Sequence, residues 1–320
     1  MDSPQPPNNA PNWERQTLEK LAFAALDEQR ARRRWGIFFK FLGFAYLIVI
    51  LFALVDWGTD AEHMESHTAL VNLNGVIQSK GEANGENLIA ALNSAFEAKN
   101  SVGVVLRINS PGGSPVQAGI IFDEIRRLRG KYPDKMLYAV VEDMCASGGY
   151  FVAAAADKIY VNKASIVGSI GVLMDGFGFT GTMDKLGVER RLLTAGDNKG
   201  FLDPFSPQAP QHKEHAQVLL NDIHKQFIDV VKTGRGNRLK ETPEMFSGLM
   251  WTGVQSVELG LADDFGSVDS VARDVIKAEK VLDYSVKDNI AERFAKRLGA
   301  NTFAGFWSGF SERAPGVLLQ

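Results

Sequence analysis

Cysteine, histidine and excess positive charge are all scarce in this sequence of 320 residues. Cys145 is the single cysteine, so an intrachain disulfide and a multi-cysteine metal site are both excluded. The formal net charge of −3 provides no basic field for a nucleic acid. No glycine turn has the spacing of a phosphate-binding or dinucleotide-binding loop. We therefore expect no nucleic-acid partner, no metal and no cofactor.

Only one apolar run is long, the stretch Gly36–Val55, which carries a single charge at Lys40. Twenty residues are enough to span a bilayer as a helix, and Lys40 can extend toward the interface. Trp35 and Trp57 flank the stretch, where interfacial aromatic residues are expected. A cleaved signal peptide is the competing interpretation, but the basic residues lie far from the start and no A-x-A site follows. The sequence therefore predicts a transmembrane anchor over 36–57.

Positive charge is distributed unevenly around this anchor. Arginines at 30, 32, 33 and 34 precede it, whereas no lysine or arginine occurs between Asp56 and Gln78. Because cytoplasmic flanks carry the excess of Lys and Arg, we expect the N-terminus in the cytoplasm and the rest of the chain outside it. His63 and His67 follow the anchor in a polar stretch, where we expect both to be solvated. The predicted divisions are a cytoplasmic arm over 1–35, the anchor over 36–57, a linker over 58–68, an α/β domain over 69–288 and a C-terminal tail over 289–320.

Apolar strand patterns and amphipathic helix patterns alternate after the linker. Buried strands that are each followed by a helix indicate an α/β fold, with a mainly parallel β-sheet and flanking helices. The predicted strands are 69–77, 102–108, 136–141, 158–161, 168–174, 188–194 and 282–286. The predicted helices are 13–34, 85–99, 116–129, 182–186, 208–232 and 267–278, with a helix-turn-helix over 243–265.

The stretch Asp143–Ala156 places a serine, Ser147, between a buried strand and an alanine-rich helix. A strand–turn–helix corner of small residues pushes a serine hydroxyl out of the sheet edge and onto a helix N-terminus. There the helix dipole and the free N–H groups favour a developing negative charge. A simple helix cap is the alternative for Ser147, since serine is a preferred capping residue.

A second glycine turn, Ser110–Gly113, also follows a strand and opens a helix. Such turns lie along the carboxyl edge of an open α/β sheet, where sites form. The N–H groups of Gly113 in one turn and Gly148 in the other are therefore candidates for an oxyanion hole.

A serine nucleophile needs a base, and the predicted sheet region contains no histidine. A Ser-His-Asp triad is available only through the late helix 208–232, which carries His212, His215 and His224. A Ser-Lys dyad is the known variant of that triad. The candidate lysines after Ser147 are Lys158, Lys163, Lys185 and Lys199.

Lys199 is distinctive because it lies in the glycine-bounded turn AGDNKG. A lysine acts as a base only when it is neutral, so a functional Lys199 has to be covered by apolar neighbours and oriented by a hydroxyl. Ser169, within Gly168–Gly171, is the candidate for that hydroxyl. The alternatives are an exposed turn lysine and a simple turn serine.

Several of these stretches together resemble the short form of bacterial signal peptide peptidase A, a serine protease family with the Clp/crotonase-type fold. They are Ser110–Gly113, Asp143–Tyr150, Gly168–Val172, the turn with Lys199 and the late TGVQSVELGLADDFG, within about Ala69 to Ala278. The resemblance implies a serine endopeptidase with a Ser-Lys dyad. The matching positions are Ser147 for the nucleophile, Lys199 for the general base, Ser169 for the residue that positions the lysine, and Gly113 and Gly148 for the oxyanion hole.

The resemblance also implies a homo-oligomer, a dome-shaped octameric ring in which neighbouring subunits supply the serine and the lysine. Its implied substrates are remnant signal peptides and other apolar peptides. The implied location is the bacterial cytoplasmic (inner) membrane, with the catalytic domain on the periplasmic side. Two alternatives stay open, namely a non-enzymatic ring-forming membrane scaffold and a crotonase-like acyl-thioester enzyme on the same fold.

Overall fold

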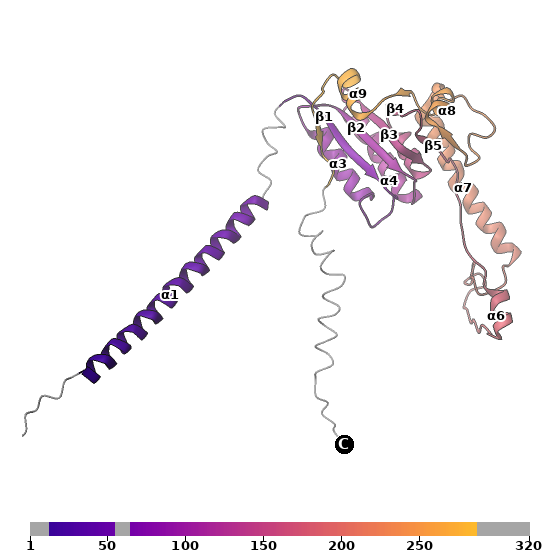
Figure 1. Cartoon of the computed structure of the whole chain (residues 1–320). Helices are drawn as coiled ribbons and strands as arrows, with labels where there is room; N and C mark the ends of the chain where they lie inside the picture. The colour runs from indigo at the N-terminus through magenta and orange to yellow at the C-terminus, as the bar shows by residue number, and fades with distance from the viewer. Residues whose placement is uncertain (1–12, 55–64, 287–320) are drawn as a thin grey trace, which may run out of the picture. The chain divides into compact units, whose positions relative to one another are not determined.

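A computed structural model of the chain describes residues 13–54 and 65–286. The chain divides into two compact units, Met1–Glu62 and His63–Gln320. The first contains one described helix, α1 (Trp13–Leu54), drawn in indigo in Figure 1. α1 joins the predicted helix 13–34 and most of the apolar stretch into one continuous helix.

Within residues 13–54 and 65–286, no helix combines the length and the apolar character needed to cross a membrane. Residues 55–57 of the predicted anchor lie outside the described residues. Residues 58–64 of the predicted linker lie outside them too. The predicted tail over 289–320 lies outside them as well.

The second unit is built on an eight-stranded sheet (Figure 1). Its main path runs in the order β6-β5-β3-β2-β1-β8, while β4 pairs with β3 and with β7. Every pair is parallel except β5 with β6, which confirms the mainly parallel sheet. The strands are β1 (His67–Asn74), β2 (Ser101–Ser110), β3 (Leu137–Ala146), β4 (Lys158–Val161), β5 (Ile166–Gly168), β6 (Met250–Thr252), β7 (Asp264–Phe265) and β8 (Val281–Asp283).

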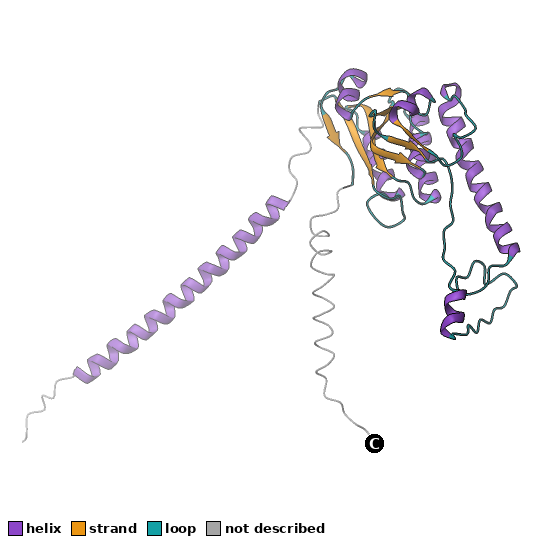
Figure 2. Ribbon diagram, turned by 45° about the vertical axis from the view of Figure 1, so that its right-hand side comes forward, coloured by secondary structure: helices purple, strands orange, loops and turns teal. Residues whose placement is uncertain are grey.

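Helices cover both faces of this sheet (Figure 2). Side chains alternate along β1, so Ala69 and Val71 join the larger core with α3 and α4, whereas Leu70 joins a smaller core with Val271. The helices are α3 (Gly85–Glu97), α4 (Pro115–Lys131), α5 (Gly148–Ala153), α6 (Thr180–Leu186), α7 (Pro210–Arg235), α8 (Gly253–Glu258) and α9 (Val268–Ser270), with the short turns η1 (Gly236–Arg238) and η2 (Val271–Ile276).

Two predicted strands are wrong. Of the residues in the strand predicted over 168–174, only Gly168 is in a strand, as the last residue of β5. The chain leaves the strand there because Gly168 and Ser169 have φ values of +105° and +50°, which an extended strand does not accommodate. Residues 188–194 form no strand, and Leu193 is 96% exposed. An apolar run becomes a strand only when another strand pairs with it, and this run lies apart from the sheet.

The helix-turn-helix predicted over 243–265 is also wrong in its first half. That half forms turns and the edge strand β6, and only the second half forms a helix, α8. The side chain of Thr252 begins α8 by accepting the N–H of Gln255 in a capping box.

His67 is fully buried, which corrects the expectation of a solvated linker residue. It is the first residue of β1, and its two ring nitrogens each lie 2.8 Å from an oxygen, the carbonyl of Glu65 and the hydroxyl of Tyr284. The contact with Tyr284 joins positions 217 residues apart, so sequence patterns near His67 do not reveal it.

Residues 171–209 form an extension between β5 and α7. Figures 1 and 2 both show α6 and its flanking loops beyond the far end of α7, away from the sheet. The helix predicted over 182–186 is confirmed as α6.

Candidate active site

Ser147 lies at the corner between β3 and α5. Its φ of +51° and ψ of −124° are values that residues other than glycine rarely adopt. The N–H of Ser147 donates to the carbonyl of Gly168 at 2.8 Å, and its own carbonyl accepts the N–H of Phe151 at 3.0 Å. Strain of about 1–3 kcal/mol persists at such a residue only where the surrounding structure over-determines it.

The side chain of Ser147 makes no capping hydrogen bond, although the residue occupies the N-cap position of α5. Capping side chains do occur in this fold, since Asn84 accepts the N–H of Asn87 at α3 and Ser114 accepts that of Gln117 at α4. The interpretation of Ser147 as a simple cap is therefore wrong.

The two glycine turns pack directly against each other. A Cβ atom added to Gly112 would lie 2.7 Å from the nitrogen of Gly148 and 2.7 Å from Cβ of Ser147. One added to Gly148 would lie 3.3 Å from the nitrogen of Gly113. Only residues without side chains allow this approach, which brings the two predicted oxyanion-hole glycines together beside Ser147.

Among the described residues, the hydrogen bonds that hold the two turns do not use the N–H of Gly113 or Gly148 as a donor. The bridge between Ile77 and Gly113 uses the N–H of Ile77 to the Gly112 carbonyl and the N–H of Ser114 to the Ile77 carbonyl, each at 2.8 Å. Gly148 is the first residue of α5, where an N–H has no acceptor within the helix. Two neighbouring backbone donors of this kind can stabilise an oxyanion.

Ser169 directly follows Gly168, the residue whose carbonyl holds the Ser147 amide. It has a φ of +50°, and its N–H donates to the carbonyl of Leu249 on the chain entering β6, at 2.8 Å. The non-glycine residues with positive φ among those described are Ser147, Ser169, Leu202 and Lys277. Two of these four are the serines predicted for the site.

Lys199 is exposed, and the structure places it in the extension. Its N–H donates to the carbonyl of Gly196 at 3.1 Å, which closes the predicted turn. Next to it, Oδ1 of Asn198 lies 3.2 Å from Nε2 of His212, in the first turn of α7. The lysine turn is therefore held at the N-terminal end of α7.

The helix that directly follows Ser147, α5, is called the serine helix below, and it contacts a different part of α7. The ring of Phe151 in α5 packs on the ring of Phe227 with centroids 5.2 Å apart. His212 and Phe227 are fifteen residues apart, which corresponds to about 22 Å along a helix. Within one chain, the structure therefore does not bring Lys199 to Ser147. Lys158, Lys163 and Lys185 are exposed as well.

Of the histidines on α7, only His224 comes near the serine corner. Its Nε2 lies 3.1 Å from the carbonyl oxygen of Ile170, next to Ser169, whereas His212 and His215 contact Phe201 in the extension. Because the recorded partner of His224 is a backbone carbonyl and not the serine or a carboxylate, these contacts do not form the triad considered for the late helix.

Sequence reasoning named His224 only as one of three candidate triad histidines. The spacing also indicates its position, since it precedes the buried Phe227 by three residues and so shares its helix face. Trp251 in β6 was missed, and the sequence gives no signal for it. A Cβ added to Gly168 would lie 2.9 Å from Cδ1 of Trp251, whose buried indole nitrogen has no partner within the described residues.

Cys145 does not compete with Ser147 as a nucleophile. It is fully buried, and this burial raises the pKa of its thiol. Within the described residues, no group of three or more His, Cys, Asp or Glu side chains could hold a metal ion.

Comparison with known proteins gives this geometry a context. Residues 130–282 match peptidase family S49. A protein of Enterococcus faecium that carries the name signal peptide peptidase SppA is 30% identical over 249 residues, which cover 75% of this chain and 72% of that protein. "Protease 4" of Haemophilus influenzae is 29% identical over 234 residues, 71% of this chain and 37% of that protein.

Greater identity occurs with much longer proteins. The "Na(+)/H(+) antiporter NhaA" of Brucella melitensis is 43% identical over 215 residues, which are 66% of this chain. The same 215 residues make up only 29% of that protein, as they do for its counterpart in Brucella abortus. The resemblance to the Enterococcus protein, in contrast, spans most of both chains. The chain therefore belongs to peptidase family S49, among its members of the signal peptide peptidase A type.

Proposed function

We propose that the chain is a serine endopeptidase in which Ser147 is the nucleophile and Lys199 of a neighbouring copy is the general base. The observation that supports this most is the strained corner at Ser147, whose side chain caps no helix and which lies against two backbone donors. Strain that is retained at a serine without a capping role is typical of functional sites.

In the proposed reaction, the neutral amine of Lys199 accepts the Ser147 proton as Oγ attacks a peptide carbonyl carbon. The N–H groups of Gly113 and Gly148 stabilise the oxyanion, and Ser169 orients the amine. The peptide C–N bond then breaks, Lys199 protonates the leaving amine, and the acyl group remains on Oγ as an ester. Lys199 next takes a proton from a water molecule that attacks this ester, and the proton returns to Ser147 as the acid product leaves.

A neighbouring copy enters the proposal because about 22 Å of α7 separates the lysine turn from the serine helix. The extension also carries exposed apolar side chains that a second copy would cover. Leu173, Phe177 and Leu193 are 82%, 75% and 96% exposed. Exposed apolar patches of this kind mark interaction surfaces. We propose that the extension seats on a neighbour and that the copies close into the octameric ring implied by the resemblance.

We further propose that the chain is anchored in the bacterial cytoplasmic membrane, with its N-terminus in the cytoplasm and the peptidase unit on the periplasmic side. Support comes from the apolar stretch Gly36–Val55 and the arginines that precede it. An enzyme anchored there meets the apolar remnants of cleaved signal peptides, which we propose as its substrates together with other apolar peptides. The name signal peptide peptidase on a relative points the same way.

Mixing two inactive variants tests the shared site. Ser147→Ala and Lys199→Ala should each abolish cleavage of an unstructured apolar peptide. A co-assembled equal mixture should regain activity, because in a ring about one site in four combines an intact serine with an intact lysine. The matched control mixes Ser147→Ala with the double variant, which restores no site. Full activity of Lys199→Ala would contradict the dyad, and no recovery in a mixture shown to co-assemble would contradict sharing.

Covalent labelling separates this proposal from the two alternatives. A serine-reactive fluorophosphonate should label the assembled protein, and Ser147→Ala should remove the label. An assembled protein that resists labelling would favour a non-enzymatic ring-forming scaffold. Thermal stabilisation by coenzyme A would instead favour an acyl-thioester enzyme.

A further inference from the structure

α7 connects the two halves of the proposed site through its opposite ends. At its N-terminal end, His212 contacts Asn198, and the ring of Phe201 packs edge-to-face on His212 with centroids 5.4 Å apart. Towards its C-terminal end, Phe227 packs on Phe151 of the serine helix, and His224 holds the carbonyl of Ile170. The helix has 26 residues and is therefore about 39 Å long.

The C-terminal end of α7 lies backbone against backbone on the end of the serine helix. A Cβ added to Gly234 would lie 2.0 Å from the carbonyl oxygen of Ala154, the residue that ends α5. No side chain fits into that contact, so the position of this helix end is set closely.

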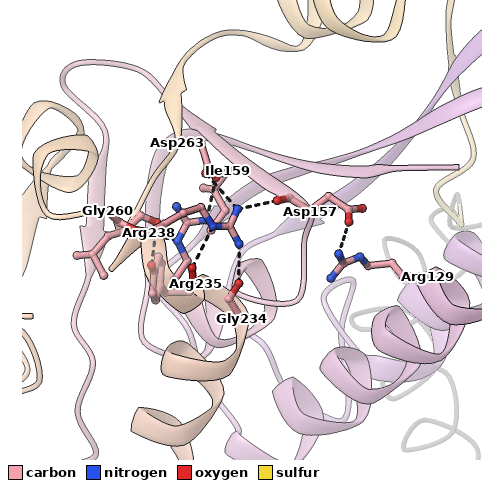
Figure 3. A network of polar contacts seen from close by, with 10 residues as sticks. Arg129, Asp157, Ile159, Gly234, Arg235, Arg238, Gly260 and Asp263 are labelled. Atoms are coloured by element: carbon pink, nitrogen blue, oxygen red, sulfur yellow. Dashed lines mark hydrogen bonds and ion pairs between the residues drawn. The ribbon is translucent and has the colours of Figure 1, made fainter. Parts of the chain in front are cut away.

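Directly after this contact, Arg235 forms the centre of a polar network that Figure 3 shows. Its side chain is completely buried. Its Nε donates to the carbonyl of Gly260, and one terminal nitrogen donates to the Asp263 carboxylate, each at 2.8 Å. The second oxygen of Asp263 accepts from Arg238 at 3.1 Å, and the backbone N–H of Ile159 also donates to Asp263, at 2.7 Å.

Arg238 also connects the C-terminal end of α7 to neighbouring backbone carbonyls. It donates to the carbonyl of Asp157, just before β4, at 2.8 Å and to the carbonyl of Gly234 at 2.7 Å. The network thus joins the end of α7 to β4 and to the loop between α8 and β7 (Figure 3). Each of these bonds has a direction, because the guanidinium group is planar and its donors are arranged as a fixed fork.

Stability alone does not account for burying this charge. Removing two charges from water is costly, and apolar side chains of similar volume are often at least as stabilising as a buried ion pair. The remaining terminal nitrogen of Arg235 is buried without a partner within the described residues, which adds to the cost. Unlike an apolar contact, the network can fix the angle at which α7 packs on the rest of the unit, because its hydrogen bonds are directional.

We propose that this network fixes the direction of α7 so that the lysine turn reaches the serine of the neighbouring copy, which makes Arg235 and Asp263 positioning residues for Lys199. The proposal rests on the proposed function. His212 lies 23 residues, or about 34 Å, from Arg235 along the helix. A rotation of about 5° at Arg235 therefore moves the lysine turn by about 3 Å. A misplacement of about 1 Å can already cost about 100-fold in rate.

The pH profile of the full-length Arg235→Met variant tests this inference. The acid-side limb of kcat/KM reports the ionisation of the base in the free enzyme. In the proposed assembly, the neighbouring copy covers Lys199 and so favours its neutral form. A misplaced Lys199 loses that cover and stays protonated to higher pH, so this limb should move in the alkaline direction. We expect kcat to fall at least about 10-fold and KM to stay within about 2-fold. A purely structural role would reduce the amount of active enzyme and leave the limb in place.

The matched control is Arg273→Met. Arg273 also pairs with an aspartate, Asp274, at 2.8 Å, but this pair is exposed on η2. The control should leave both the rate and the limb unchanged. A limb that stays in place in a folded Arg235→Met variant, or one that moves equally in the control, would overturn the inference.

A second pair of variants covers the possibility that Arg235→Met does not fold. Asn221 and Asp222 are exposed positions of α7 between the lysine turn and the serine helix. Replacing both by glycine weakens the helix there and leaves the network intact, whereas replacing both by alanine removes the same side chains from a continuous helix. Only the glycine pair should lower kcat and move the limb, and equal behaviour of the two pairs would refute α7 as a rigid connection. Lys199→Met distinguishes failure of the proposed function from failure of this inference. Full activity of Lys199→Met would refute the proposed dyad. An inactive Lys199→Met variant, together with an unchanged limb in the other variants, would refute only the positioning role of the network.

Discussion

The contact between the two glycine turns predicts a severe effect for Gly112→Ala. Gly112 has a φ of +97°, and an added Cβ would lie 2.7 Å from the nitrogen of Gly148, 2.7 Å from Cβ of Ser147 and 2.8 Å from the carbonyl oxygen of Ala146. Two of these three atoms belong to the backbone, so no side-chain rotation relieves the overlap. The two turns have to separate.

The magnitude follows from two costs. An alanine with this φ costs about 1–2 kcal/mol, and an extra carbon in a packed site costs about 1–3 kcal/mol more. The free energy of unfolding should therefore fall by about 2–5 kcal/mol, which lowers the Tm of a domain of this size by about 4–20 °C. The same movement displaces the N–H of Gly148 from Ser147, and loss of one oxyanion donor lowers kcat by about 100–1,000-fold.

Thermal unfolding and peptide cleavage measure the two effects separately. Gly119→Ala is the matched control, because Gly119 lies within α4 and an added Cβ meets nothing within 4 Å. That variant should keep full activity and gain about 0.5–1 kcal/mol of stability. A Gly112→Ala protein that unfolds within about 1 °C of the parent and labels normally at Ser147 would refute the close packing of the two turns.

Three further predictions follow from the described contacts. Ser147→Gly should abolish fluorophosphonate labelling and yet raise the free energy of unfolding by about 1 kcal/mol, because glycine adopts the φ of +51° without strain; a loss of stability in chemical denaturation would contradict the strain. Phe227→Ala should cost about 3–5 kcal/mol in the same assay, since it empties the contact between α7 and Phe151; a cost below about 1 kcal/mol would contradict this packing. Burial alone would raise the pKa of Asp263, but the hydrogen bond and the charge of Arg235 outweigh it and hold that pKa below its ordinary value. Asp263 therefore stabilises the fold above about pH 4 and loses this contribution as the pH falls through its folded-state pKa, so Asp263→Asn should flatten the acid end of the curve of stability against pH, and an unchanged curve would contradict the pairing.

Local patterns were sufficient for much of this fold. The strand predicted over 158–161 matches β4 at both ends, and the helix predicted over 85–99 differs from α3 by two residues at one end. Both rest on periodicity and on turn residues that act over a few positions. The corner around Ser147 is likewise visible in the sequence, because a buried strand, a small-residue turn and a helix are consecutive there.

Contacts between distant segments explain what the patterns missed. Burial of His67 depends on Tyr284, and the strand predicted over 188–194 does not form because no strand of the sheet lies beside it. The positive φ of Ser169 is maintained by a hydrogen bond to Leu249, eighty residues later. Contacts between segments so far apart in the sequence cannot be predicted from local patterns, since the residues that neighbour a side chain along the chain are the same whether it is buried or exposed in the fold.

By itself, the sequence determined an α/β chain with a mainly parallel sheet and a serine at a strand–helix corner, because hydrophobic period, glycine and proline act locally. Only the tertiary structure decided that Gly113 and Gly148 lie together, that the Ser147 side chain caps nothing, and that Lys199 stays at the other end of α7. The physical reason is that close backbone approach depends on packing between segments that are far apart in the sequence. The direction that we propose for α7 likewise depends on the network around Arg235, which joins segments between residues 157 and 263.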